Sequence, residues 1–257
     1  KIDLLRSDAV KFLKGADAVY HLAANPDVRL GERDHQAHLQ QNVLVTWNVL
    51  EACRKADCRS FLFTSSSTVY GVPTQIPTPE SYGPCLPISL YGASKLAAES
   101  FISAYCDNYG LSGVACRMAN IVGGRGHGVI KDFIAKLRAN PTRLEILGDG
   151  RQSKSYVHVN DCVNALLACS RNSKKKIMEV FNISNVDRTS VKEIAEIVAS
   201  EMHLHPRFEY TGKQAWKGDV PQMLLDSRKL RALGWKPRLN SREAVEKACG
   251  ECLREKN

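Results

Sequence analysis

The chain has 257 residues, of which 44% are hydrophobic and 25% charged, which is ordinary for a globular protein with a buried core. No apolar run reaches the roughly 18 residues of a membrane span, and no signal peptide opens the chain, so we expect a cytoplasmic protein with no membrane partner. The formal net charge is +9, but the basic residues are spread along the chain and form no nucleic-acid-binding motif. These properties argue against a nucleic-acid partner.

The nine cysteines follow no regular spacing, and several lie inside apolar segments. This distribution is typical of reduced, buried thiols rather than of a disulfide framework. Cys249 and Cys252 form one CxxC pair near the C-terminus. Because no second pair or histidine partner accompanies it, we interpret the pair as two positions on a terminal helix and expect no metal site.

Short apolar strands alternate with helices in the first half of the chain. The predicted strands are residues 18–22, 61–64 and 114–118, and the predicted helices are residues 34–55 and 91–109. Continuous apolar strands separated by helices indicate a parallel sheet covered on both faces. We therefore expect an α/β protein with a Rossmann-like doubly wound sheet.

Smaller elements follow the glycine-rich segment 123–126. They are helices at residues 129–138, 160–170, 190–202 and 241–254, and strands at 144–147, 156–159 and 180–183. Ser190 and Glu193 form a capping box at the start of one helix. We predict two domains, 1–122 and 123–257, the second being a smaller α/β lobe on the carboxyl ends of the strands, with some segments returning to the sheet.

The strongest chemical signal is the run Tyr91-Gly92-Ala93-Ser94-Lys95, with Ser66 upstream at the end of a predicted strand. Tyr91 and Lys95 are four residues apart and share one helix face. A tyrosine acts as a base near neutral pH only if its pKa falls from about 10 toward 7, a shift of roughly 4 kcal/mol. The Lys95 ammonium and a bound cationic nicotinamide ring would favour the phenolate. We predict Tyr91, Lys95 and Ser66 as catalytic residues, with Ser66 bonded to a substrate hydroxyl.

Longer segments of the chain resemble the UDP-glucose 4-epimerases of the extended short-chain dehydrogenase/reductases, the NAD-dependent epimerase/dehydratase family. They are HLAA at 21–24, NVLVTWNVLEA at 42–52, FTSSSTVYG at 63–71, YGASK at 91–95, RMANIVG at 117–123 and GDGRQSKSYVHVND at 148–161. The resemblance runs in order along essentially the whole chain and is most detailed for archaeal members.

The resemblance implies NAD as the cofactor and a nucleotide sugar of the UDP-hexose type as the substrate. Residues 1–122 would be a partial NAD-binding domain, and residues 123–257 mainly a substrate lobe. Hydride would pass from sugar C4 to NAD⁺ while Tyr91 removes the hydroxyl proton, and the 4-keto sugar would turn over and take the hydride back. Family members often pair through two helices of each subunit, which implies a homodimer through helices 34–55 and 91–109.

The resemblance also implies individual contacts. Those with the cofactor are Asp3, Leu4, Leu22, Ala23, Ala24, Asn42, Ser65, Tyr91, Lys95 and Ala119. Those with the substrate are Ser66, Tyr91, Asn120, His127, Val129, Leu144, Ile146, Lys154 and Lys217.

Three segments depart from the family pattern or decide between its members. Lys154 and Ser155 stand where arginine and aspartate are usual, and residues 215–217 lack the arginine expected near the diphosphate. Lysine meets phosphate as a point charge without the two-pronged contact of arginine, so the nucleotide preference stays open. Ser67 and Thr68 occupy the positions of the acidic residues that sugar dehydratases and decarboxylases need, which argues against both activities.

The chain begins at Lys1, and no strand followed by GxxGxxG precedes residue 20. By the logic of the dinucleotide fold, roughly 50 residues that include the pyrophosphate-binding helix N-terminus would precede it. We therefore expect this polypeptide alone to bind NAD poorly. Two alternatives to the 4-epimerase stay open: another sugar-nucleotide epimerase or reductase, including one that uses NADPH, and a catalytically silent sensor or scaffold.

Overall fold

The computed structural model of the chain describes residues 2–124, 128–172, 177–212, 216 and 218–254. The strands are β1 (Ala18–His21), β2 (Ser60–Ser66), β3 (Ser112–Met118), β4 (Asn120–Val122), β5 (Arg143–Ile146), β6 (Ser153–Lys154), β7 (Tyr156–His158), β8 (Met178–Ile183), β9 (Thr189–Ser190), β10 (Arg207–Tyr210) and β11 (Gln222–Met223). The α-helices are α1 (Val10–Leu13), α2 (Val45–Lys55), α3 (Leu90–Tyr109), α4 (Val129–Ala139), α5 (Val159–Asn172), α6 (Val191–Glu201), α7 (Arg228–Arg231) and α8 (Ser241–Arg254). Two 3-10 turns, η1 (Val28–Glu32) and η3 (Ser67–Tyr70), and a π-helical segment, η2 (Leu39–Leu44), complete the list.

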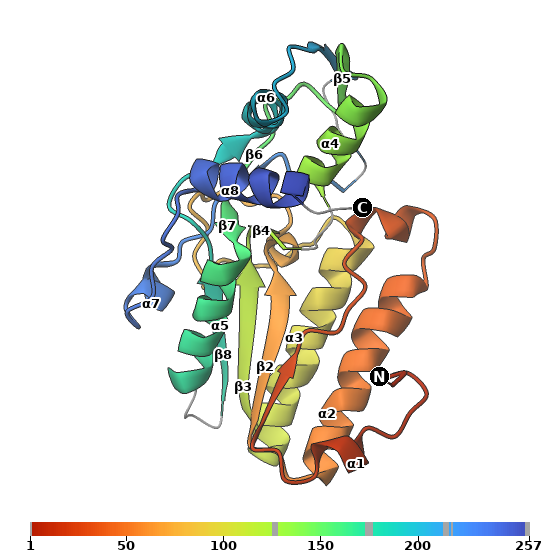
Figure 1. Cartoon of the computed structure of the whole chain (residues 1–257). Helices are drawn as coiled ribbons and strands as arrows, with labels where there is room; N and C mark the ends of the chain where they lie inside the picture. The colour runs from red at the N-terminus through yellow and green to blue at the C-terminus, as the bar shows by residue number, and fades with distance from the viewer. Residues whose placement is uncertain (1, 125–127, 173–176, 213–215, 217, 255–257) are drawn as a thin grey trace.

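The main sheet has four parallel strands in the order β1-β2-β3-β8 (Figure 1). Alternate residues of β2 serve opposite faces: Phe61 and Phe63 pack with the α2 and α3 side, and Leu62 packs with the α5 side. Burial on both faces explains why the strands are continuous apolar runs. The predicted α/β class and Rossmann-like sheet are confirmed.

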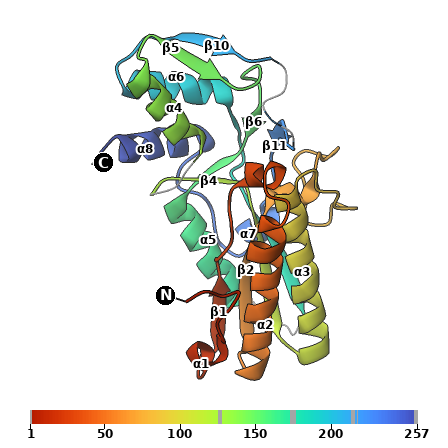
Figure 2. The ribbon, with the colours of Figure 1, turned by 90° about the vertical axis from the view of Figure 1, so that its right-hand side faces the viewer.

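A second core lies at the carboxyl ends of the strands, where α4, α6 and α8 pack with β5 (Figures 1 and 2). All its members come from residues 122–253. Ser190 and Glu193 form the predicted capping box at the start of α6. The intervening strand β8 pairs with β3 of the main sheet, so the chain leaves the lobe and comes back to it. The domain boundary at residue 122 stays a prediction.

The structure corrects the helix predicted over residues 34–55. Residues 34–36 form turns, and the helix is widened into the π-helical segment η2 before α2 begins. Asn42 lies in η2, and its side chain bonds to the backbone of Asn25, in the loop after β1. The carbonyl of Asn42 accepts a hydrogen bond from Thr46 Oγ1 at 2.6 Å. Wide turns of this kind often occur at functional sites.

Several elements were not predicted. These are the short helices α1 and α7 and the strands β4, β6, β9, β10 and β11. Each is four residues or shorter, which is too short to show a hydrophobic period. Among the described residues, no helix combines the length and apolar character that crossing a membrane requires.

Gly92 marks a close approach between α3 and η3. A Cβ atom added there would lie 2.7 Å from the carbonyl oxygen of Thr68. Alanine normally stabilises a helix by about 0.5–1 kcal/mol relative to glycine, whereas overpacking against backbone costs about 1–3 kcal/mol. Because a backbone oxygen cannot move aside as a side chain can, we predict that Gly92→Ala lowers the free energy of unfolding by about 1–2 kcal/mol.

Gly250 in α8 provides the matched control, because the nearest atom to an added Cβ would be 3.6 Å away, an ordinary contact. Gly250→Ala should raise the free energy of unfolding by about 0.5–1 kcal/mol. Urea unfolding of both variants measures the two changes. Equal stabilisation by both would show that α3 does not press against η3.

Candidate active site

The three predicted catalytic residues come together where β2 ends and α3 begins. Ser89 begins α3 by accepting a hydrogen bond from the backbone N–H of Gly92, which puts Tyr91 in the first turn. The Tyr91 hydroxyl lies beside the side chain of Ser66, the last residue of β2, and interacts with it. This end of the sheet faces the lobe, as Figure 1 shows.

Lys95 lies one turn further along α3 and is almost fully buried. Its Nζ donates a hydrogen bond to the Thr64 carbonyl at 2.8 Å and lies 4.7 Å from the centre of the Phe63 ring. The distance from Nζ to the centre of the Tyr91 ring is 5.8 Å. Burial lowers the pKa of Lys95 to about 8, and the charge of Glu99 opposes that change.

The protonation of Tyr91 differs from the sequence-based expectation. Burial raises the pKa of Tyr91 above its usual value, and the hydrogen bond from Ser66 lowers it by less. Lys95 is not among the causes of this shift in the chain by itself, so its effect on the pKa of Tyr91 beside a bound cofactor stays a prediction. The two effects identified in the chain leave the phenol protonated, and additional positive charge next to its oxygen is what would reverse this.

Leu22, Ala23 and Ala24 follow β1 at the same end of the sheet. Leu22 and Ala23 are exposed, and Ala24 is half-buried. Small exposed residues at the carboxyl end of a parallel strand leave the backbone open to a ligand, which is where open α/β sheets bind nucleotides. Their placement agrees with the predicted cofactor contacts.

Asn42 is fully buried next to this loop. Its Oδ1 accepts a hydrogen bond from the backbone N–H of Asn25 at 2.7 Å, and its Nδ2 donates to Ser94 Oγ at 3.0 Å. Asn42 thus ties the loop after β1 to the helix that carries Tyr91. Both ends of the amide are engaged within the protein, so Asn42 shapes the predicted cofactor site through its neighbours.

The other residues predicted to contact the cofactor have side chains or backbone groups that already bond or pack within the protein. Asp3 is exposed and accepts a hydrogen bond from Leu5 N–H, while Leu4 packs beside the core under α2 and its carbonyl accepts from Asn48. Ser65 donates its hydroxyl to Glu99 Oε1 at 2.5 Å. Ala119 is buried, and its N–H donates to the carbonyl of Ile183 on β8.

The predicted substrate residues lie mostly in the lobe. Asn120 is half-buried and its side chain bonds the Tyr156 hydroxyl, while Val129 packs against the lobe core. Leu144 and Ile146 have no exposed surface, so their side chains belong to that core and offer a substrate nothing to touch. This corrects the expected side-chain contacts of the two residues.

Lys154 forms an ion pair with Asp219 at 2.6 Å, and the side chains of both residues are largely buried. The Lys154 ammonium also lies 5.3 Å from the centre of the Trp216 ring. The lysine predicted to meet phosphate therefore already has a partner of opposite charge. His127 and Lys217, the two remaining predicted substrate residues, lie outside the described residues.

Four residues near these positions were missed by the sequence analysis. They are His38, Glu99, Arg117 and Trp216. His38 is buried with its ring 5.6 Å from that of Tyr91, and Trp216 lies between Arg29 and Lys154. Glu99 and Arg117 form a buried ion pair at 2.7 Å. Charged residues in an apolar helix face and an apolar strand were the available signal for that pair, because buried charges need partners.

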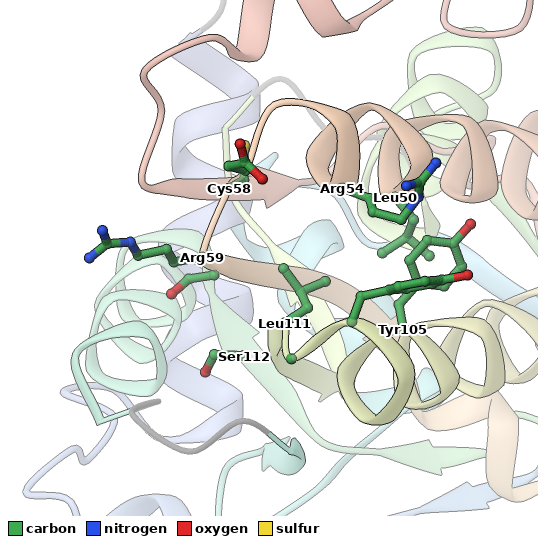
Figure 3. A pocket seen from close by; sticks show the side chains of 11 residues that line it. Leu50, Arg54, Cys58, Arg59, Tyr105, Leu111 and Ser112 are labelled. Atoms are coloured by element: carbon green, nitrogen blue, oxygen red, sulfur yellow. The ribbon is translucent and has the colours of Figure 1, made fainter.

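A cavity of about 640 Å³ lies at the opposite end of the sheet, where β2 and β3 begin (Figure 3). It is lined by Leu50, Arg54, Asp57, Cys58, Arg59, Ser60, Tyr105, Tyr109, Gly110, Leu111 and Ser112. In Figure 3 Arg54 and Tyr105 lie together at one side, and Arg59 and Ser112 at the other. Arg54 is already paired with Glu51 at 3.0 Å. No predicted catalytic residue lines this cavity, so we place the chemistry at the carboxyl ends of the strands.

A dinucleotide-type parallel sheet with a tyrosine and a lysine on one helix turn beside a strand-end serine defines an oxidoreductase-like enzyme of the short-chain dehydrogenase type. The chain belongs to the NAD-dependent epimerase/dehydratase family, whose model matches residues 1–184. Its cofactor is therefore NAD.

Individual relatives carry related names. A Methanocaldococcus jannaschii protein provisionally named a UDP-glucose 4-epimerase is 34% identical over 91% of this chain and 76% of its own length. The solved structure of a UDP-galactose 4-epimerase is 41% identical, with a TM-score of 0.89 over 99% of this chain and 83% of that one. The UDP-glucuronic acid 4-epimerase of Bacillus cereus, solved with UDP-glucuronic acid and NAD, is 28% identical with a TM-score of 0.89 over 98% of this chain and 80% of that one.

The described residues fit the nicotinamide end of NAD. The open backbone after β1 and the small side chains of Ala23 and Ala24 leave room at the carboxyl end of the sheet. Lys95 and Tyr91 supply hydrogen-bond donors from α3, and Asn42 fixes the loop after β1 against that helix. Within the described residues we find no glycine-rich helix start that would hold the pyrophosphate.

His21, the last residue of β1, is buried in the neutral form. Burial is the main cause that lowers its pKa from 6.5 to about 4. Its Nε2 lies 3.0 Å from Thr46 Oγ1, whose own hydrogen is donated to the Asn42 carbonyl, so Nε2 is the donor. The folded state therefore resists protonation of this ring.

Because the unfolded chain binds this proton near pH 6.5 and the folded chain only near pH 4, stability is fully present above pH 6.5 and is lost as the pH falls between these values. We predict a loss of up to about 3 kcal/mol from this group. His21→Gln, whose amide nitrogen replaces Nε2, should lose less stability than the parent between pH 7 and pH 4.5. Urea unfolding at both pH values measures the difference.

The exposed His205 provides the control, and His205→Gln should keep the pH dependence of the parent. If His21→Gln loses as much stability on acidification as the parent does, His21 does not carry this dependence.

Proposed function

We propose that this protein interconverts the C4 epimers of a UDP-hexose, such as UDP-glucose and UDP-galactose, with NAD held as a prosthetic group. The observation that carries the proposal is the meeting of Tyr91, Ser66 and Lys95 at the carboxyl end of the sheet. Residues 1–122 would hold the cofactor, and residues 123–257 mainly the sugar nucleotide. The names of the relatives support this reaction class.

The roles of the three residues follow from their contacts. Tyr91 would hold and move the proton of the sugar C4 hydroxyl, and Ser66, beside Tyr91, would orient that hydroxyl. Lys95 would place a positive charge beside the phenol and donate to a ribose hydroxyl. NAD supplies the hydride acceptor and returns the same hydride, so no net oxidation occurs.

The sugar is the least constrained part of the proposal. Relatives named for UDP-glucuronic acid, for UDP-N-acetylglucosamine and for GDP-mannose all match most of this chain. Lys154 is paired with Asp219 and cannot form the two-pronged contact with a diphosphate that an arginine would form. We choose UDP-glucose and UDP-galactose because relatives with those names match this chain well.

Tyr91→Phe tests the chemistry. We predict that it lowers kcat by about 10²–10⁴-fold, because it removes the proton-transferring oxygen, while the fold persists. The protein expressed from its whole reading frame is incubated with NAD and UDP-galactose, UDP-glucuronic acid or UDP-N-acetylglucosamine, and the epimers are separated by chromatography. Thermal unfolding reports whether each variant is folded.

Tyr109→Phe is the matched control, because Tyr109 is exposed at the far end of the same helix. It should retain the parent rate. Turnover of a sugar nucleotide at the parent rate by Tyr91→Phe would refute the catalytic role, and a parent that holds NAD but turns over none of the sugars would favour a scaffold.

We also propose that the protein is a cytoplasmic homodimer. None of the nine cysteines forms a disulfide, which fits a reducing compartment. The helices α2 and α3, which pack against each other, carry exposed apolar side chains, including Trp47 on α2 and Phe101 on α3. Exposed aromatic residues on adjacent helices are typical of an interface, and the same pair of helices in a second copy would cover them.

Trp47→Glu combined with Phe101→Glu tests the dimer. The double variant should be monomeric at concentrations where the parent is dimeric, because two charges per subunit would be buried in the interface. Light scattering during gel filtration gives the mass. Val186→Glu, at an exposed apolar position on another part of the surface, should stay dimeric. A parent that is monomeric at high concentration would contradict the proposal.

A further inference from the structure

Glu99 is a buried carboxylate next to the candidate active site. It lies on α3, one turn after Lys95, and its side chain is 4% exposed. Its Oε1 accepts a hydrogen bond from Ser65 Oγ at 2.5 Å and its Oε2 accepts from Arg117 Nη2 at 2.7 Å. A carboxylate with this many donors is held in one orientation.

Arg117 makes that arrangement possible. Its side chain is 8% exposed, and its Nε and Nη2 both donate to Glu99, which is the two-pronged contact that arginine forms best. The guanidinium also lies 4.7 Å from the centre of the Tyr70 ring and donates to the Glu80 carbonyl. The cation is thus fixed by groups from three parts of the chain, and it holds the carboxylate from the side of β3.

The carboxylate connects with the catalytic residues at two points. Ser65 precedes Ser66 at the end of β2, so the hydrogen bond to Glu99 ties this strand end to α3. Lys95 and Glu99 are four residues apart on α3 and share a helix face. The charge of Glu99 favours the ammonium form of Lys95, against burial that disfavours it.

We propose that Glu99 is a positioning residue of the candidate active site, which keeps the buried Lys95 ammonium charged beside Tyr91 while Ser65 and Arg117 hold its carboxylate in place. The proposal rests on the proposed function for the catalytic role of the site, but the charge of Lys95 can be measured without turnover. The pKa of Lys95 is about 8, so a further decrease of about one unit would leave half of the lysine neutral near pH 7.

Other groups also face Lys95. Tyr91 lies on the same helix, and Phe63 and the Thr64 carbonyl lie on β2. The charge of Lys95 also lowers the pKa of His21 on β1 and of His38 beside η2. Burial lowers the pKa of both histidines, so neither is the counterion. Glu99 is the carboxylate whose charge opposes the effect of burial on Lys95.

The charge of Lys95 is measured by NMR titration of the chain labelled with ¹³C at lysine Cε, with the Lys95 signal assigned by its loss in Lys95→Arg. In Glu99→Gln we expect the pKa of Lys95 to fall by about one pH unit or more. Because this variant leaves Arg117 buried without its partner and could unfold, Glu99→Gln is also combined with Arg117→Met. Replacing both members of a buried pair by neutral groups is often tolerated, and the pKa of Lys95 should still fall.

Two variants complete the experiment. Glu99→Asp keeps the charge and should return the pKa of Lys95 toward the parent value. Asp107→Asn removes an exposed carboxylate from the same helix, about two turns after Glu99, and should leave the pKa of Lys95 unchanged. A pKa of Lys95 that stays at the parent value in the folded double variant would overturn the proposal. That result could occur with or without epimerase turnover, so the two proposals fail separately.

Discussion

The candidate active site depends on the burial of one ammonium group. Lys95 places its charge against the ring of Phe63 and under the end of β2, where the Thr64 carbonyl accepts a hydrogen bond from it. A buried charge is costly unless it is bonded and paired. The surroundings of Lys95 satisfy both needs: a backbone carbonyl is within bonding distance, and a carboxylate lies one helix turn away. Gly92 contributes as well, because the absence of its side chain lets α3 come close to η3, the turn that follows β2.

The same burial decides the state of the tyrosine. Tyr91 is enclosed enough that its pKa is raised, so the chain by itself keeps the phenol protonated beside Ser66. The positive charge of an oxidised nicotinamide ring would favour the phenolate by the ordinary rule for opposite charges. Reactivity would then depend on the cofactor, while the orientation of the hydroxyl depends on the fold.

The lobe plays a different role from the sheet. Its core of α4, α6, α8 and β5 is separate from the two cores that cover the sheet, and the side chains of Leu144 and Ile146 belong to it. The strand β6 brings Lys154 to the ion pair with Asp219, next to Trp216. The predicted catalytic groups are thus fixed by the sheet and α3, whereas the residues expected to distinguish substrates come from shorter segments of the lobe.

The sequence alone was enough to predict the class of fold, the parallel strands and the capping box, and to select Tyr91, Lys95 and Ser66 as the predicted catalytic residues. These follow from local periodicity and from motifs whose members are close in the chain or at the ends of clear strands. Only the tertiary structure decided that the Asn42 side chain forms hydrogen bonds with Asn25 and Ser94. The same holds for the burial of Leu144 and Ile146 in a core and for the ion pair of Lys154 with Asp219. It also decided that burial raises the pKa of Tyr91 and that Glu99 meets Arg117. Burial and long-range pairing join residues far apart in the chain, and no local pattern carries that information.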